Sequence, residues 1–413
     1  MTLQSERSLR PSESKDVGRC PVTHTDYRLE RPVLENYQLL NAEREDARFS
    51  WNDSTDHGFW MVNRYDDVVE AIRMFDTFSN RQVNAFVNDM AVPLLPNSLD
   101  PPEHTQMRRM LNPFFSPAAV KRMEPLARER ARSMIADLAP RGGDDLTTGF
   151  ALLYPTELFL ALLGLPVEDG PEFLPRVEAV FGGFFKAGNA SPEEAEAAAA
   201  WITSYFDAKV DERLANPGDP AVDLLTRVLQ TPVGEEKLAR EEVLNLMMTL
   251  MLAGLDTTRS ALGYMFMHLA RDVDLRHQLT AEPALWPRFI EEAVRLYSLI
   301  IEDGRIATRD VDFHGVDVRQ GDMLWLGLAA ANRDPRKFSD PDRFDMDRPD
   351  LNHHLGFGAG QHRCIGMHLA RAELVIALEE WHAAIPEYRI ADGAQLRERG
   401  GQLKLVSLPL EWD

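Results

Sequence analysis

The segment with the most chemical information lies near the C-terminus, where residues 353–371 read HHLGFGAGQHRCIGMHLAR. Three glycines precede His362 and Cys364. A nucleotide-binding loop would need a hydrophobic strand before it or Gly-Lys-Ser/Thr after it, and neither is present. Structural zinc prefers several thiolates, whereas this segment holds one cysteine among four histidines. A lone cysteine can also be an inert, small apolar residue.

Ligation of a haem iron by a thiolate fits these residues better. Glycines let the backbone approach a cofactor closely, and a helix that begins after Cys364 directs its dipole and amides at the sulfur. The pattern FGxGxHxCxGxxLAR, residues 357–371, resembles the haem-binding signature of the cytochrome P-450 monooxygenases. This resemblance implies haem b (iron protoporphyrin IX) as cofactor, Cys364 as the axial iron ligand, and Phe357 and Gly366 as neighbours of the haem.

A second motif, AGLDTT at residues 253–258, interrupts a pattern that predicts one helix over about 235–271. Glycine inside a helix costs about 1 kcal/mol, so the break indicates a kink or a functional site. The motif resembles the oxygen-activation motif of the same family. Cleavage of dioxygen needs protons in a dry site, and the resemblance assigns this role to Asp256 and Thr257, with Ala253 against the haem. A threonine bonded back to its own helix is the alternative.

Two sets of charged residues match further family motifs. Glu292 and Arg295 share one helix face, and an isolated pair of this kind contributes only a few tenths of a kcal/mol. With Arg343 downstream, the resemblance implies a buried structural network of these three residues. It also implies four residues that bind the haem propionates, for each of which a solvated charged face is the alternative. These four are His104, Arg108, Arg305 and His362.

Many helices and a few short strands are expected to position these residues. The run at 59–62 predicts a strand, the spacing over 64–75 predicts a helix, and Ser191 before Pro and two acids predicts a helix start. Alternating runs after residue 304 and near the C-terminus predict small sheets. The expected fold class is mainly α with small β-sheets. The resemblance implies the cytochrome P-450 fold, a single large helical domain enclosing haem over 31–413, after a flexible tail over 1–30.

The composition excludes several classes of protein. Lys and Arg number 45 and Asp and Glu number 66, so the formal charge of −21 argues against a nucleic-acid binder. Two cysteines, Cys20 and Cys364, cannot form a disulfide framework and fit a reducing cytosol, and no chemical role is expected for Cys20. The longest apolar stretch, 149–167, is interrupted by Pro155 and Glu157, and the first twenty residues lack an apolar run. We expect a soluble, cytoplasmic monomer without a membrane anchor.

The resemblance implies a monooxygenase that inserts one atom of O2 into a substrate by hydroxylation, epoxidation or O-dealkylation. No reductase domain is expected in the chain, so electrons would come from an external 2Fe-2S ferredoxin with a NAD(P)H-dependent ferredoxin reductase. Residues 104–123 contain Arg108, Arg109, Lys121 and Arg122 and no acid, and we expect this stretch to dock an acidic ferredoxin rather than to be only a solvated helix face.

A haem peroxygenase that uses hydrogen peroxide and a non-catalytic haem or zinc sensor are the alternative functions. An intact Asp256 and Thr257 argue against the peroxygenase, because peroxide already brings its protons.

The segment EDGRIATRDVDFHG, residues 302–315, is most similar to the bacterial camphor hydroxylase type, but Val92 replaces an aromatic hydroxyl donor of the camphor enzyme. We therefore expect a different small or medium apolar substrate, such as a terpenoid or an aromatic compound. Thr249 precedes Thr257 by about two helical turns and shares its face. The expected pocket residues are Val92, Leu94, Leu95, Thr249, Leu252, Ile300, Ile301 and Gln402. Core packing is the alternative for the apolar members.

Overall fold

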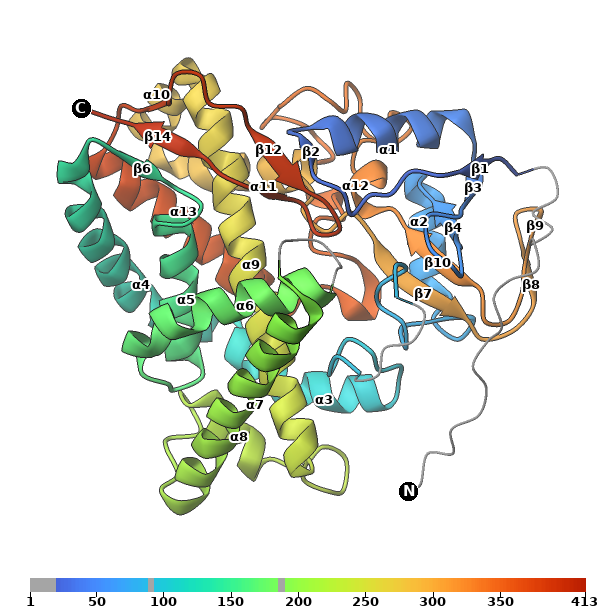
Figure 1. Ribbon diagram of the computed structural model, residues 1–413, viewed down its shortest axis with the longest axis horizontal. Helices are drawn as coiled ribbons and strands as arrows, with labels where there is room; N and C mark the ends of the chain where they lie inside the picture. Colours follow the sequence, from blue (N-terminus) through green and yellow to red (C-terminus); the bar gives the residue numbers. More distant parts are fainter. Residues whose placement is uncertain (1–19, 88–92, 185–189) are drawn as a thin grey trace.

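The computed structural model describes residues 20–87, 93–184 and 190–413, and the statements below concern these residues. Helices form a bundle on one side of the molecule, and the largest sheet lies on the other side beside α1 and α2 (Figure 1). The helices are α1 (Glu35–Asp46), α2 (Tyr65–Arg73), α3 (Glu103–Leu111), α4 (Pro117–Leu138), α5 (Phe150–Leu162), α6 (Gly170–Phe184), α7 (Pro192–Ala215), α8 (Leu224–Gln230), α9 (Arg240–Arg271), α10 (Val273–Ala281), α11 (Trp286–Leu296), α12 (Leu328–Ala331) and α13 (Met367–Ala384).

The strands form one larger sheet and three small ones. The larger sheet has the order β1-β3-β4-β10-β7-β5, and the small sheets are β11-β14-β6, β13-β12-β2 and the hairpin β8-β9. The strands are β1 (Val22–Thr23), β2 (Arg31–Pro32), β3 (Phe49–Asn52), β4 (Phe59–Val62), β5 (Phe78–Ser79), β6 (Gly143–Asp145), β7 (Asp303–Ala307), β8 (Val311–Phe313), β9 (Val316–Val318), β10 (Met323–Leu326), β11 (Arg389–Ile390), β12 (Arg397–Arg399), β13 (Lys404–Leu405) and β14 (Pro409–Glu411). The expected class, mainly α with small sheets, is therefore confirmed.

Helix α9 runs through the middle of the bundle and packs against α5, α7, α11 and α13 (Figure 1). It is continuous through the AGLDTT motif. A Cβ atom on Gly254 would lie only 2.8 Å from Cδ2 of Phe159, so the glycine allows α5 to pack closely against α9. The helix begins five residues later than the sequence suggested, because the backbone of Ala239 is extended and its N–H donates to the carboxylate of Glu242 at 2.7 Å.

Residues 20–30, which the sequence places before the expected domain boundary at residue 31, contact the rest of the fold. Strand β1 pairs in parallel with β3, and the Tyr27 side chain is fully buried. The N–H of Gly401 donates to the carbonyl of Tyr27 at 2.8 Å. Residues 20–30 are thus tied to the domain by contacts that are distant in sequence, which local composition could not indicate.

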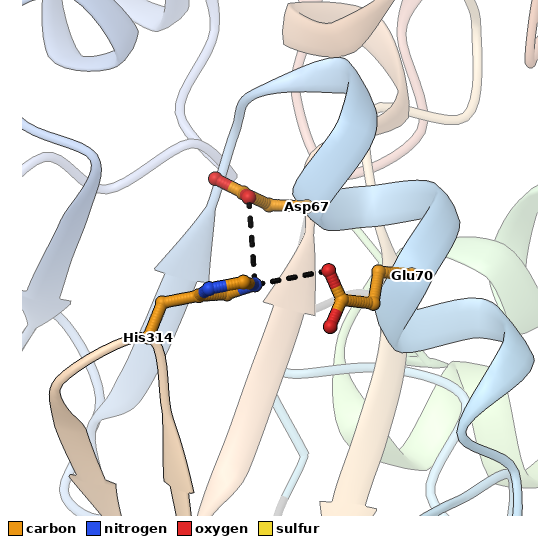
Figure 2. Close-up of side chains that lie close together, drawn as sticks. All are labelled: Asp67, Glu70 and His314. Atoms are coloured by element: carbon orange, nitrogen blue, oxygen red, sulfur yellow. Dashed lines mark hydrogen bonds and ion pairs between the residues drawn. The ribbon is translucent and has the colours of Figure 1, made fainter.

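The hairpin β8-β9 is fastened to α2 by the charged cluster in Figure 2. Nε2 of His314 lies 2.9 Å from Oε2 of Glu70 and 3.9 Å from Oδ1 of Asp67. These atoms could serve a cation as ligands, but Arg48 donates to both carboxylate oxygens of Asp67, at 2.6 and 2.9 Å. Because Arg48 already neutralises the Asp67 carboxylate, we interpret the cluster as a set of polar contacts that joins the hairpin to the helix.

Candidate active site

A cavity of about 350 Å³ lies between α9, the segment before β7 and the loop before α13. It brings together residues that are far apart in the sequence. Among the residues that border it are Leu94, Arg108, Thr249, Leu252, Ala253, Thr257, Ile300, Phe357, His362, Cys364 and Gln402. Most of this wall is apolar, so the cavity suits a large apolar group.

Cys364 lies at the end of a glycine-containing loop, two residues before the N-cap of α13. Its backbone N–H donates to the carbonyl of Phe357 at 2.8 Å, and Gly358 and Gly360 both have positive φ, which this tight loop requires. The accessible surface of the thiol belongs to the cavity wall, and burial raises its pKa. A hydrogen bond from the Gly366 backbone opposes that shift and favours the thiolate.

Three guanidinium groups also stabilise a thiolate at this position. The positive charges of Arg108, Arg371 and Arg363 all lower the pKa of Cys364. Arg108 donates to the carbonyls of Arg363 and Gln361, at 2.9 and 3.4 Å, and pairs with no carboxylate in the described chain. The loop therefore directs a soft sulfur ligand into the cavity, where a bound metal ion would take it as the thiolate, and leaves a guanidinium beside it for an anionic group.

The rings of His104 and His362 pack against each other where His362 borders the cavity, with centroids 3.9 Å apart and planes tilted by 33°. None of their four ring nitrogens has a hydrogen-bond partner within the described chain. Burial and the neighbouring positive charge of Arg108 lower the pKa of His104 to about 4, and burial together with His104, Arg305 and Arg108 lowers that of His362 to about 2. Both rings are therefore neutral, and each has one N–H donor that lacks an acceptor.

These observations fit haem. A flat apolar ring would occupy the cavity, and Cys364 would bind its iron. Its two carboxylates would accept hydrogen bonds from one N–H of His104, one N–H of His362 and the guanidinium of Arg108. Arg305 is buried near this pair, but its guanidinium is already bound by Asp303 at 2.6 Å.

Thr257 borders the cavity, and its hydroxyl donates to the carbonyl of Ala253 at 2.8 Å. The bond back to its own helix, the alternative explanation for this threonine, is therefore present together with a position on the cavity wall. A hydroxyl so held can rotate to donate to a group in the cavity while it accepts a proton from a neighbour.

Asp256 lies behind this wall and is 3% exposed. Its carboxylate accepts hydrogen bonds from Nε2 of Gln402 at 2.9 Å and from Nζ of Lys404 at 3.1 Å. Nη1 of Arg259 lies 3.7 Å away. Lys404 and Arg259 both also pair with Glu178 on α6, whose side chain is 32% exposed. A chain of charged groups thus connects Asp256 to the surface.

The sequence did not indicate this network. Gln402 was expected to contact substrate, and it does border the cavity, but its amide also holds Asp256. Lys404 and Glu178 were missed, because nothing in their local sequence shows that β13 and α6 bring these side chains together beside Asp256.

Some of the expected pocket residues border the cavity and others lie in the core. Those that border it are Leu94, Thr249, Leu252, Ile300 and Gln402. Leu95 packs among the buried side chains of α3, α5 and α9, and Ile301 is fully buried in the main core, so neither borders the cavity. Leu94 and Ile300, in contrast, both border the cavity. Val92 lies outside the described residues.

The expected network of Glu292, Arg295 and Arg343 requires a correction. Glu292 and Arg295 are completely buried and form a bidentate ion pair at 2.7 Å. The Arg343 side chain is exposed, and only its carbonyl takes part, accepting from Arg295 at 3.3 Å. The chain turns after Arg343 and brings the buried Arg348 to 3.5 Å from Glu292. Arg348 is therefore the second arginine of the network.

Comparisons with known proteins agree with this geometry. The family model described as "Cytochrome P450" matches residues 189–381. The chain is 35% identical to the probable cytochrome P450 127A1 of Sinorhizobium fredii, over 86% of this chain and 84% of that protein. It is 34% identical to the mycinamicin IV hydroxylase/epoxidase of Micromonospora griseorubida, over 76% and 79%.

A solved structure, that of CYP101J2, superposes with a TM-score of 0.86 at 30% identity, covering 97% of this chain and all of that one. CYP101C1 superposes with a TM-score of 0.84 at 27% identity, covering 97% and 100%. The protein therefore belongs to the cytochrome P-450 family of haem-dependent monooxygenases, and the expected similarity to the camphor type is supported. In the described residues, every helix is too short or too polar to span a membrane.

Proposed function

We propose that this monooxygenase takes electrons from an external 2Fe-2S ferredoxin and its NAD(P)H-dependent reductase to oxidise a small or medium, mainly apolar substrate. The reaction would be a hydroxylation, an epoxidation or an O-dealkylation. The observation that carries the proposal is that Cys364, Ala253 and Thr257 border one cavity although they come from separate motifs. Haem, when bound, supplies the iron that activates dioxygen.

The residues of the chain have distinct tasks in this reaction. Cys364 would hold the iron as an electron-donating thiolate, and His104, His362 and Arg108 would hold the haem carboxylates. Asp256 would pass protons from the Glu178 side of its network, and Thr257 would donate one into the cavity. A peroxide-driven reaction would not need this connection to the surface.

The site can be tested with one spectrum and one variant. The reduced protein under carbon monoxide should show the red-shifted Soret band of a thiolate-ligated haem, and absence of haem absorbance would refute the proposal. Replacing Thr257 with Ala should raise the hydrogen peroxide released per NADH oxidised in a reconstituted system. Full coupling of NADH to product in that variant would show that Thr257 has another role.

The expected ferredoxin-docking stretch lies on α3 and the start of α4. Arg109, Lys121 and Arg122 are exposed there, whereas Arg108 is half-buried and donates to the loop that carries Cys364. A cationic surface in a chain of charge −21 would attract an acidic donor, and such attraction weakens with salt. Replacing Arg109 with Glu should lower the rate of electron transfer at low salt. Equal rates for the wild type at low and high salt would contradict the docking role.

We propose that the protein is a cytoplasmic monomer. Both described cysteines are free, which fits the reducing environment of the cytoplasm. Size-exclusion chromatography with light scattering would test the monomeric state.

A further inference from the structure

Glu302 places a carboxyl group in the wall of the cavity, immediately before β7. The residue is only 7% exposed. One carboxylate oxygen accepts a long hydrogen bond, 3.4 Å, from the backbone N–H of Ala85. Among the described residues, no side chain donates to this carboxyl group. It is thus a buried acid without a cationic partner.

The nearest guanidinium is not available to Glu302. Arg305 donates to both oxygens of Asp303, at 2.6 and 2.8 Å, and to the carbonyl of Gly304 at 2.7 Å. The negative charge of Asp303 raises the pKa of Glu302, whereas the positive charge of Arg305 lowers it. On the facing segment, residues 80–87, the only charged side chain is Arg81, which is exposed to solvent.

Two amides of that facing segment also border the cavity. Asn80 and Asn84 are both 2% exposed, and Oδ1 of Asn80 and Nδ2 of Asn84 have no partner in the described chain. Oδ1 of Asn84 accepts from the N–H of Phe86 at 2.8 Å, which fixes the orientation of that amide. Glu302 therefore belongs to a polar region in an otherwise mainly apolar wall.

Burial of an unpaired carboxyl group is unfavourable, and it is tolerated most often at functional sites. Burial is the main reason why the pKa of Glu302 lies well above its usual range. A cation beside the carboxyl group would remove this penalty, because an opposite charge at short range favours the ionised form. A neutral apolar ligand would leave the penalty in place.

We propose that Glu302 determines the specificity of the cavity by binding a positively charged nitrogen on an otherwise apolar substrate. This inference rests on the proposed function, because it assumes that the substrate enters the cavity. When a ligand with a permanent positive charge binds, the Glu302 proton leaves to solvent and the carboxylate pairs with the ligand. The affinity for such a ligand therefore rises with pH until Glu302 is ionised in the free protein.

The experiment uses the haem-loaded protein and two ligands of the same shape, cyclohexyltrimethylammonium and tert-butylcyclohexane. They differ by a charged nitrogen in place of a carbon, and the quaternary nitrogen cannot coordinate iron. Dissociation constants come from calorimetry and from the shift of the Soret band over a range of pH. The wild type should bind the cation more tightly than the hydrocarbon, increasingly so as the pH rises.

Replacing Glu302 with Gln should weaken cation binding roughly tenfold, as expected when one charged interaction is lost, and abolish its pH dependence. Binding of the hydrocarbon should change little. Ile300→Val is the matched control, because Ile300 borders the same cavity without charge and its change should affect both ligands alike.

Three results would overturn the inference: no binding of the cation, equal affinity for both ligands at every pH, or unchanged cation affinity in Glu302→Gln. The comparison of the two ligands in the wild type needs no variant to fold. The carbon monoxide spectrum of the same samples separates the two proposals. A thiolate-type spectrum without charge preference contradicts the role of Glu302 alone, whereas absence of that spectrum contradicts the monooxygenase.

Discussion

Asp256 and Glu302 are two buried carboxyl groups beside the same cavity, and their surroundings differ sharply. Asp256 accepts hydrogen bonds from Gln402 and Lys404 within a network that reaches Glu178 on α6. Glu302 accepts one long hydrogen bond from a backbone N–H. The partners of Asp256 thus stabilise its charge and connect it to the surface for proton exchange. Glu302 has no such partner within the described chain, and a ligand could supply one.

The largest expected effect comes from removing the charge of Asp256. Asp256→Asn should lower the rate of NADH oxidation in the reconstituted system by about 10²–10³-fold, because a positioned proton donor contributes about that much. Stopped-flow measurement at several pH values would check this, with the carbon monoxide spectrum as a control for the haem site. An unchanged rate would mean that Asp256 is a structural ion-pair residue.

The next effect concerns the cation that accompanies Asp256. Lys404→Met should lower the free energy of unfolding by about 3 kcal/mol, because it leaves a buried carboxylate with fewer partners. Urea denaturation of the haem-loaded protein would measure the change. Lys209→Met on α7 is a suitable control, since the carboxylate that pairs with Lys209, that of Glu212, is exposed. This variant should lose much less stability, although Lys209 also lies 5.5 Å from the centre of the Tyr205 ring. Equal losses in both variants would contradict the importance of the network.

Glu302→Gln should have the opposite sign and raise the free energy of unfolding at neutral pH by about 1–2 kcal/mol. The pKa of Glu302 is higher in the folded than in the unfolded protein, so ionisation first favours the unfolded chain. The wild type should therefore lose stability as pH rises above the unfolded pKa of about 4.3, until Glu302 ionises in the folded protein too, and the variant should lack this loss.

Denaturation curves over that pH range would check the sign, with Glu129→Gln at an exposed position as the control. A variant less stable than the wild type at neutral pH would show that Glu302 has a stabilising partner after all.

The smallest effect is expected for the neutral partner of Asp256. Gln402→Leu removes one amide hydrogen bond and should lower the free energy of unfolding by about 1 kcal/mol. It should also lower the rate of NADH oxidation, because Asp256 loses a donor that orients its carboxylate. Gln402→Asn, which retains an amide, tests whether that group is responsible. A rate of NADH oxidation equal to that of the wild type in Gln402→Leu would show that Asp256 does not need this amide.

The sequence by itself was sufficient for those features that contiguous residues determine. The capping box of Ser191 and Glu194 begins α7, as the residue pattern predicted, because both partners lie within one helical turn. The loop that presents Cys364 and the motif that holds Asp256 and Thr257 are also contiguous, so residue types and spacing were enough to indicate their chemistry.

The tertiary structure alone decided which distant groups meet. It brought Arg348 rather than Arg343 to Glu292, and it turned Ile300 but not Ile301 toward the cavity. These outcomes depend on where the chain reverses and on how each segment packs against its neighbours. The pairing of Asp256 with Lys404 and the isolation of Glu302 have the same origin, because the strength of a buried charge depends on neighbours that folding brings within hydrogen-bond reach.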